Sequence, residues 1–300
     1  MVHKSVKSRV RELGTSDEGL HVLRAALGLE GDWTGPNRPI LLAIDFEHTK
    51  NFVTGFIHGE EGQVGLATLD TEELHTTLPE ELISTHNLIL GPSDYTSKVS
   101  GNVLFGTKAI IEPAQVLKEI QSLIPRDRDI ILMGHGVHTE LDILVRLGFT
   151  FSPRITIIDT LEVAKKAVKC HKYELKVVLR TLCCPHVKVH TAGNDANFTL
   201  RAALLLVAHK FTNQHHPTID ILRSVAMEPL APLIEAEARA ARRLEKKIAD
   251  LNRGKDQARS RTPGQIAELR AQRAAKKAEP EVDAWNTSYR RLRRAEAMNM

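Results

Sequence analysis

The stretch PILLAIDFE, residues 39–47, combines an apolar run with two carboxylates at its end. A compact apolar run that follows a proline and is rich in branched side chains predicts a buried strand. Side chains i and i+2 of a strand point to one face, so Asp45 and Glu47 are expected to project together. Two like charges that close cost free energy unless a cation or a basic group neutralises them. Solvent-facing acids at a strand exit are the commoner reason for a D-x-E pair, so this stretch alone does not establish a site.

Segments with alternating strand and helix patterns lie on both sides of this stretch. A second strand at residues 61–70 could pair with it as a hairpin, and residues 75–110 are expected to hold a further strand, 86–90, in a polar loop. This order predicts a mixed sheet covered by helices, in an α/β or α+β architecture. Further strands are expected at 129–136 and at the start of 154–168, and helices at 19–29, 113–124, 139–149, 173–184 and 194–211.

The composition changes near residue 232, where Ala, Glu, Arg and Lys become dominant. From residue 235 onward there are 17 Lys and Arg and 10 Asp and Glu, which leaves 24 basic and 27 acidic side chains in the first 234 residues. A basic tail beside an acidic body suggests an anionic partner, usually nucleic acid, although a solvated helix that binds nothing is the commoner case. We therefore expect an N-terminal extension (1–35), a globular domain (36–228) and a basic tail (229–300) that is helical or disordered.

Three features of the chain bear on its location in the cell. No run of 18 apolar residues exists, so a membrane span is not expected, and the N-terminus lacks the apolar segment of a secretory signal. The three cysteines include no C-x-x-C pair, which favours free thiols in a reducing compartment. A cytoplasmic or nuclear protein is the expectation.

A second group of acids occurs in MGHGVHTELDIL, residues 133–144, which reads as a strand end, a glycine turn and a helix start. Glu140 and Asp142 are about 200° apart on a helix, so only one of them can face a site. Taken alone, acids in the first turn of a helix are more often partners of the helix dipole than catalysts. His135 in the turn is expected to be structural rather than a metal ligand.

A third group lies in KVHTAGNDANFTL, residues 188–200, just before the long apolar helix. Asp195 could cap that helix, but a cap does not explain His190, which lies in the preceding loop and could reach the same cleft. Mg²⁺ prefers carboxylate oxygens, and a two-metal phosphodiester site needs acids from different elements to converge. Such a site also needs a base that titrates near neutral pH, for which histidine is suited.

Taken in order, D-x-E, then G-H-x-x-x-x-[DE], then H-x-x-x-x-D resemble the motifs of the DEDDh 3′-to-5′ exonucleases of the ribonuclease-H-like superfamily. The likeness covers residues 38–210, and IDFEHTK, VGLATLDTEEL and HTAGNDANFTLRAALLL resemble the fungal branch, one member of which is a helper factor in mRNA export. The resemblance implies a ribonuclease-H-like α/β fold with a mixed five-stranded sheet flanked by helices.

The resemblance also implies a role for each candidate residue. Asp45 would bridge two Mg²⁺ or Mn²⁺ ions, Glu47 and Asp195 would bind the ion that activates water, and His190 would be the general base. The remaining acid, usually Asp in the family, would support the other ion, and here that position holds Glu140. Asp142 is the competing assignment, but Glu140 keeps the family spacing from the histidine. The longer side chain of Glu140 departs from the family pattern.

Two classes of function follow from this resemblance. The first is a metal-dependent 3′-to-5′ exonuclease, a hydrolase acting on RNA or single-stranded DNA. The second is a weakly active or inactive nucleic-acid-binding adaptor in mRNA metabolism or export. In either case the basic tail is expected to contact phosphates or a partner protein. The presence together of Asp45, Glu47, His190 and Asp195 favours the enzyme.

Overall fold

The computed structural model describes residues 18–31, 33–35, 37–57, 59–209, 211, 216–230 and 264. Contacts divide the chain into residues 1–228 and residues 229–300, and every element named below lies in the first of these units. The predicted basic tail falls almost wholly outside the described residues, so its conformation and its role stay predictions. No helix in the described ranges is long and apolar enough to cross a bilayer.

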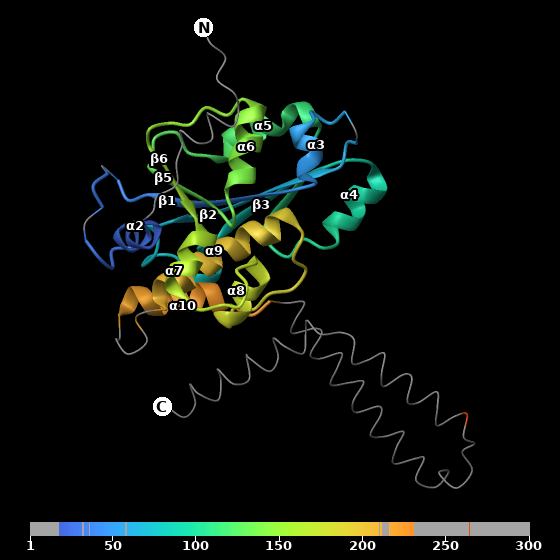
Figure 1. The fold of residues 1–300 in the computed structure, drawn as a ribbon. Helices are drawn as coiled ribbons and strands as arrows, with labels where there is room; N and C mark the ends of the chain where they lie inside the picture. The colour runs from blue at the N-terminus through green and yellow to red at the C-terminus, as the bar shows by residue number, and fades with distance from the viewer. Residues whose placement is uncertain are drawn as a thin grey trace. The chain divides into compact units, whose positions relative to one another are not determined.

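A mixed six-stranded sheet forms the centre of the fold, in the order β4-β3-β2-β1-β5-β6 (Figure 1). β1 pairs antiparallel with β2, as the hairpin prediction required, and parallel with β5; β2–β3 is antiparallel, and β3–β4 and β5–β6 are parallel. The strands are β1 (Ile40–Glu47), β2 (Gly62–Asp70), β3 (Ser84–Leu90), β4 (Thr107–Ile110), β5 (Ile130–Gly134) and β6 (Ile155–Asp159).

The predicted α/β class is confirmed, and the sheet has one strand more than the five expected. The additional strand is β4, which has the sequence TKAI and is exposed at all four positions. An exposed edge strand lacks the apolar alternation by which strands are detected in a sequence, so this segment was assigned to a polar loop. The same loop also contains α4 (Ser93–Ser100).

Helices cover both faces of the sheet (Figure 1). On one face, Leu42, Ile44 and Phe46 of β1 enter an apolar cluster with α5 and α6. On the other face lie α9 and the helices that surround it, α7, α8 and α10. The helices are α2 (Gly19–Ala26), α3 (Thr49–Val53), α4 (Ser93–Ser100), α5 (Val116–Leu123), α6 (His138–Leu147), α7 (Thr160–Ala167), α8 (Leu175–Thr181), α9 (Ala192–Ala208) and α10 (Pro217–Met227).

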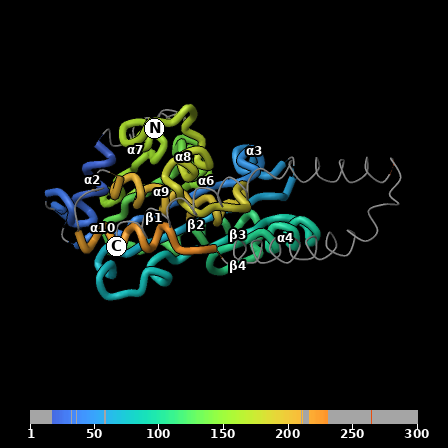
Figure 2. The backbone as a smooth tube through the Cα atoms, turned by 90° about the horizontal axis from the view of Figure 1, so that it is seen from below, coloured from blue at the N-terminus to red at the C-terminus, as the bar shows by residue number. Residues whose placement is uncertain are grey.

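The central helix α9 is buried along its whole length. Its apolar sequence, AALLLVA, has no polar stripe, which is expected of a helix covered on every side. α9 packs on β1 and β2, and α10 crosses its far side (Figure 2). Arg201 of α9 is buried and binds the carbonyl oxygens of Ala226 and Glu228 at the end of α10. The position of α9 is therefore fixed from both sides.

The N-terminal segment contributes α2 to this unit. Leu23, Ala26 and Leu27 are fully buried, and α2 packs against α7 and α9. The sequence predicted the helix but placed it in an extension separate from the domain that begins at residue 36. Its apolar face is instead part of the same core, which is why the segment reads as an amphipathic helix.

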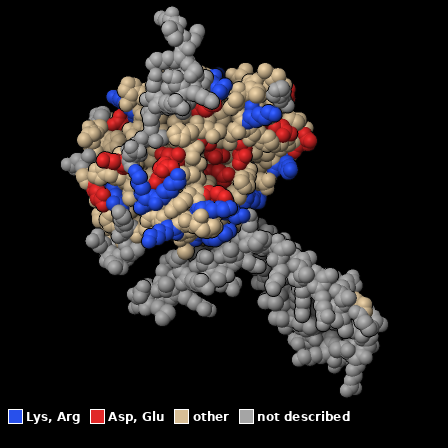
Figure 3. Space-filling view, in the orientation of Figure 1, with Lys and Arg blue, Asp and Glu red and all other residues tan. Residues whose placement is uncertain are grey.

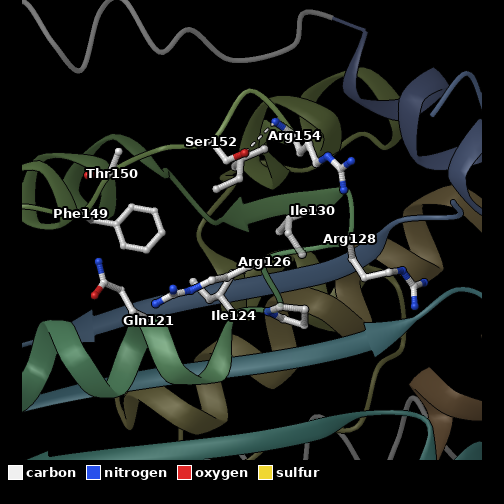
Figure 4. Close-up of a pocket in the computed structure, with 11 residues that line it drawn as sticks. Gln121, Ile124, Arg126, Arg128, Ile130, Phe149, Thr150, Ser152 and Arg154 are labelled. Atoms are coloured by element: carbon white, nitrogen blue, oxygen red, sulfur yellow. Dashed lines mark hydrogen bonds between the residues drawn. The ribbon is translucent and has the colours of Figure 1, made fainter. Parts of the chain in front are cut away.

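A cavity of about 320 Å³ opens where β5 and β6 begin (Figure 4). Its apolar wall includes Ile130, Phe149 and Ile155, and Arg126 and Arg154 also line it. Because Ile130 pairs with Ile40, the first residue of β1, the cavity lies at the opposite end of the sheet from Asp45 and Glu47. It is therefore separate from the acidic residues singled out in the sequence.

Candidate metal centre

The first two candidate acids, Asp45 and Glu47, lie at the carboxyl end of β1. The neighbouring parallel strand β5, which leads to Glu140, ends at the same edge of the sheet. The strands pair in parallel from Ile40–Ile130 to Ala43–Met133, so both finish at this edge. Asp45 and Glu47 belong to β1 and alternate with Ile44 and Phe46, whose side chains enter the cluster on the opposite face. The two carboxylates therefore share the face that α9 covers, as the i, i+2 spacing predicts.

The amino end of α9 approaches β2 directly beside Asp45. Gly65 is the cross-strand partner of Asp45, and a Cβ atom at Gly65 would collide with the backbone of Ala192 and Gly193. The side-chain oxygen of Gln63 accepts a hydrogen bond of 3.1 Å from the Ala192 amide. A glycine is thus required where the helix backbone touches the strand, and this contact places the first turn of α9 over Asp45.

Asp195 extends from this first turn and fixes the loop before it. Its Oδ2 accepts a hydrogen bond of 2.8 Å from the backbone N–H of His190, which lies one residue before the Thr191 N-cap. His190 has a left-handed φ of 66°, and its side chain is 84% exposed. Asp195 therefore does not cap α9, whose N-cap Thr191 has no side-chain capping hydrogen bond. One of its oxygens instead holds the loop before the helix, and the other, Oδ1, is buried with no partner among the described residues.

The imidazole of His190 lies close to Glu47. His190 Nδ1 is 3.8 Å from Glu47 Oε1. One ligand atom each from Glu47, His190 and Asp195 can be chosen so that all three lie within 4.8 Å of one another, a grouping that could hold a metal ion. Glu47 comes from β1 and the other two from the start of α9, so residues almost 150 positions apart in the sequence meet here.

Glu140 and Asp142 point in different directions from α6, as their helical spacing predicts. Glu140 is buried in the first turn, and its charge raises the pKa of Asp45. Asp142 instead accepts a 2.8 Å hydrogen bond from Arg146 Nε, one turn along the helix. Of the two acids, Glu140 is therefore the one that faces Asp45.

Burial raises the pKa of every acid in the site, and neighbouring charges modify the effect. The pKa of Asp45 lies well above its ordinary value because the residue is buried and because Asp195, Glu140 and Glu47 repel its negative charge. Burial is also the main reason that the pKa of Asp195 and that of Glu140 rise to about 7. The pKa of Glu47 is raised by burial, against the opposing effect of His190 and His48.

Three carboxylate oxygens of this cluster are inaccessible to solvent and lack a hydrogen-bond partner among the described residues: Asp45 Oδ2, Glu140 Oε2 and Asp195 Oδ1. Asp45 as a whole is half-buried, so it is this one oxygen that is enclosed. Buried polar atoms of native proteins nearly always have partners, and exceptions require an explanation. The carboxylates of Glu47 and Asp195 and the imidazole of His190, whose ligand atoms can lie within 4.8 Å of one another, fit a hard divalent cation such as Mg²⁺ or Mn²⁺. A bound cation would also relieve the mutual repulsion of the acids.

Sequence reasoning missed the polar residues beside Glu47. Gln63 of β2 pairs with Glu47 across the strands and, besides binding Ala192, donates a 2.9 Å hydrogen bond to the Tyr95 hydroxyl on α4. His48 has a φ of 60° and packs edge-on against Tyr95, with ring centroids 5.2 Å apart. The signal that could have identified Gln63 and its partners is the glutamine itself, which stands directly before the apolar residues of the predicted strand EGQVGLATLD.

His135 has the structural role expected for it. Its Nδ1 is 3.0 Å from Thr160 Oγ1 and its Nε2 is 2.7 Å from the Tyr173 carbonyl oxygen. Both ring nitrogens are therefore occupied, and burial lowers the pKa of the ring. The histidine joins the turn before α6 to the chain around α7 and α8.

A comparison with known protein families matches this region of the chain. Residues 40–206 match the family model DEDDh_C, described as DNA polymerase III subunit epsilon-like, C-terminal domain. The matched segment is more than half of the 300 residues and includes Asp45, Glu47, Glu140, His190 and Asp195. No curated protein matches the chain.

Proposed function

The chain belongs to the DEDDh family described by this model, and from that membership we propose that it is a 3′-to-5′ exonuclease that uses two Mg²⁺ or Mn²⁺ ions to hydrolyse RNA or single-stranded DNA. The observation that carries the proposal is the grouping of Glu47, His190 and Asp195 beside Asp45, whose pKa the charges of Asp195, Glu140 and Glu47 raise, with three enclosed oxygens that have no partner among the described residues. A cluster that costs so much repulsion is expected where cations bind.

The four acids would divide the ions between them. Asp45, whose pKa is raised by the charges of the other three acids, would help to hold both ions. Glu47 and Asp195 would hold one ion, and Glu140 would support the other. Bound divalent ions would lower the pKa of water and neutralise charge on the phosphoryl oxygens. Asp142, which pairs with Arg146, has no part in this assignment.

The remaining chemistry belongs to the protein side chains. Water attacks the phosphorus of the terminal phosphodiester, and the bond from phosphorus to the 3′-oxygen of the preceding nucleotide breaks. His190 accepts the proton of the attacking water, and the departing 3′-oxygen takes a proton from solvent. The products are a nucleoside 5′-monophosphate and a strand shortened by one nucleotide. The exposed ring of His190, 3.8 Å from Glu47, can receive this proton and pass it to solvent.

The direct test is the shortening of a 5′-labelled oligonucleotide of about 20 nucleotides. RNA and single-stranded DNA are incubated separately with the full chain and Mg²⁺ or Mn²⁺, and the labelled products are resolved by length. We expect a ladder that shortens from the 3′ end, release of nucleoside 5′-monophosphates, and no reaction after addition of a chelator. Oligonucleotides that stay intact with both ions across pH 6–9 would contradict the proposal.

His190→Ala is expected to lower kcat by roughly 10²–10⁴-fold, the usual contribution of a general base. The stabilisation of the protein by Mn²⁺, measured as a shift in melting temperature, should remain, because the carboxylates are unchanged. His21→Ala is the control, since this ring is also exposed but belongs to α2. An unchanged kcat would remove His190 from the role of base, and a lost Mn²⁺ shift would make it a ligand.

The second candidate function is a nucleic-acid-binding adaptor with weak or no activity, acting in mRNA metabolism or export. Glu140 favours it, because the acid at this position is Asp in most of the DEDDh family and the spacing of the two ions in such sites is tight. The oligonucleotide assay separates the two functions. Binding of intact RNA without shortening would support the adaptor, and metal-dependent shortening at a rate that Glu140→Asp does not raise would argue against it.

A further inference from the structure

A basic surface lies beside the acidic site. We use this term for the Lys and Arg side chains of α7, α8 and the segment between them. Six basic residues occur in residues 160–181 against two acidic ones, Glu162 and Glu174. Lys176 is half-buried and the other five basic side chains are exposed. The members of the basic surface are Lys165, Lys166, Lys169, Lys172, Lys176 and Arg180.

The fold places this surface next to the candidate metal centre. His135 lies in the turn that leads to Glu140, and its ring contacts Thr160 at the start of α7 and Tyr173 just before α8. At its other end, α8 leads through residues 182–189 to His190. Figure 3 shows acidic side chains near the middle of this face, with Lys and Arg gathered below them over α7 and α8. The surface is thus attached to two of the three elements that supply the site.

Ion pairs that hold charges of the basic surface can be exchanged for contacts with an anionic ligand. Two of these charges form exposed ion pairs with neighbouring acids, Lys165 with Glu162 at 2.6 Å and Lys172 with Glu174 at 3.7 Å. Exposed ion pairs of this kind contribute little to stability, so a phosphate can replace the acid at small cost. α7 and α8 have eight and seven residues, about 12 and 10 Å of helix, which is long enough to contact several successive phosphates.

A strand whose 3′ end enters an acidic site needs cations along the rest of its backbone. The two ions of the proposed site would offset the charge of its four acids, so attraction for the rest of the polyanion must come from basic side chains elsewhere on the surface. We propose that the basic surface binds the sugar–phosphate backbone of the substrate strand upstream of its 3′ end. This inference rests on the proposed function, since it takes the strand to be the substrate of the same site. The inference predicts that these lysines strengthen the binding of longer substrate strands. It also predicts that they do not affect hydrolysis at the terminal nucleotide.

The test compares two full-length variants that each lose four positive charges. Lys165, Lys166, Lys169 and Lys172 are replaced by Gln in the first variant. Lys118, Arg126, Arg146 and Arg154, which are also exposed but belong to α5, α6 and the end of the sheet with the cavity, are replaced by Gln in the control. Both are assayed on a 20-nucleotide strand, as RNA and as DNA, and on the 4-nitrophenyl ester of thymidine 5′-monophosphate, which has no upstream backbone.

For the first variant we expect KM for the 20-nucleotide strand to rise at least 10-fold, with kcat and the rate on the ester unchanged within about 2-fold. Binding of the same strand is also measured with both variants carrying Asp45→Asn, at several salt concentrations. The slope of log affinity against log salt should fall by roughly 0.7 for each lost phosphate contact, and the control should keep the original slope. Equal effects in both variants, or none in either, would overturn the inference.

The design separates this inference from the proposed function. If the unaltered chain hydrolyses neither the ester nor the strand, the proposed function fails, but the binding measurement still decides whether the basic surface contacts nucleic acid. If the ester is hydrolysed and the first variant keeps its KM and salt slope, the function stands and the basic surface has no part in it. A fall in ester hydrolysis by the first variant would show damage to the site itself and would also count against the inference.

Discussion

Asp45→Asn is expected to reduce hydrolysis by roughly 10³-fold or more, at the upper end of what a single electrostatic group supplies, while it makes the ion-free protein more stable. The carboxylate of Asp45 is the group that Asp195, Glu140 and Glu47 all repel. An uncharged amide of the same size removes that repulsion, and we expect the free energy of unfolding without ions to rise by about 1–3 kcal/mol. An ordinary core residue would show the opposite sign on substitution.

The ion response gives this prediction a second measurement. A ligand present at 100 times its Kd stabilises the folded state by about 2.7 kcal/mol, so Mn²⁺ should raise the melting temperature of the unaltered protein. Asp45→Asn should lose most of this rise. Asp142→Asn is the matched control, because it removes a carboxylate that pairs with Arg146 on the same helix as Glu140. It should keep both activity and the Mn²⁺ response.

Two outcomes would contradict this account of Asp45. If Asp45→Asn destabilises the ion-free protein, contacts made by the Asp45 carboxylate stabilise the fold. These contacts would then outweigh the repulsion between Asp45 and the other three acids. If Asp142→Asn loses activity to the same extent as Asp45→Asn, the rival assignment of Asp142 as the metal ligand is correct.

The ion-free protein is expected to lose stability as pH rises from about 4 to 7. Asp195 and Glu140 are buried, and their pKa values in the folded state are about 7, above the ordinary 3.8 and 4.5 of the unfolded chain. A raised carboxyl pKa means that the folded state binds more protons, so raising the pH favours unfolding. The loss in free energy of unfolding is absent below the pKa values of the unfolded chain. It grows as pH rises from those values to about 7, and it reaches its full size above pH 7. Its ceiling is roughly 3–4 kcal/mol for each group.

The measurement is the free energy of urea unfolding at pH 4.5, 6 and 8, with a chelator and with excess Mg²⁺. Mg²⁺ should flatten the decline, because it favours the ionised acids. His135, whose pKa is lowered by burial, contributes with the opposite sign, so variants are needed to isolate the carboxylates. Because the pKa values of Asp45 and Glu47 are also raised, Glu140→Gln with Asp195→Asn should make the decline smaller without abolishing it, whereas Asp142→Asn should leave the decline unchanged. A stability that rises with pH in the ion-free protein would refute the prediction.

Much of the sheet could be predicted because its strands are buried. β1 and β5 contain continuous apolar runs, and the D-x-E spacing places Asp45 and Glu47 on one face. The grouping of these acids with Asp195 and Glu140 came from the family resemblance, since sequence spacing alone does not specify which distant segments meet. Contacts made by backbone atoms, such as the approach of Ala192 to Gly65, decide that grouping.

The parts that escaped prediction share a physical reason. β4 is exposed at all four positions and α4 buries only Thr96 and Val99, so no apolar periodicity marks either segment. Gln63 and Tyr95 act through a hydrogen bond between segments 32 residues apart, which no local pattern encodes. The sequence predicts a structural role for His135 but does not identify its hydrogen-bond partners. These are Thr160 and Tyr173, which come from segments later in the chain.

The complete burial of α9 makes the smallest folding unit larger than the family match. That match begins at residue 40 and ends at residue 206, whereas α2 and α10, which cover parts of α9, lie outside it. A polypeptide trimmed to the matched limits would expose a broad leucine-rich strip to water, and strips of that kind drive aggregation. Fragments made for crystallisation or assay should therefore start before Gly19 and continue past Leu230, which is itself buried.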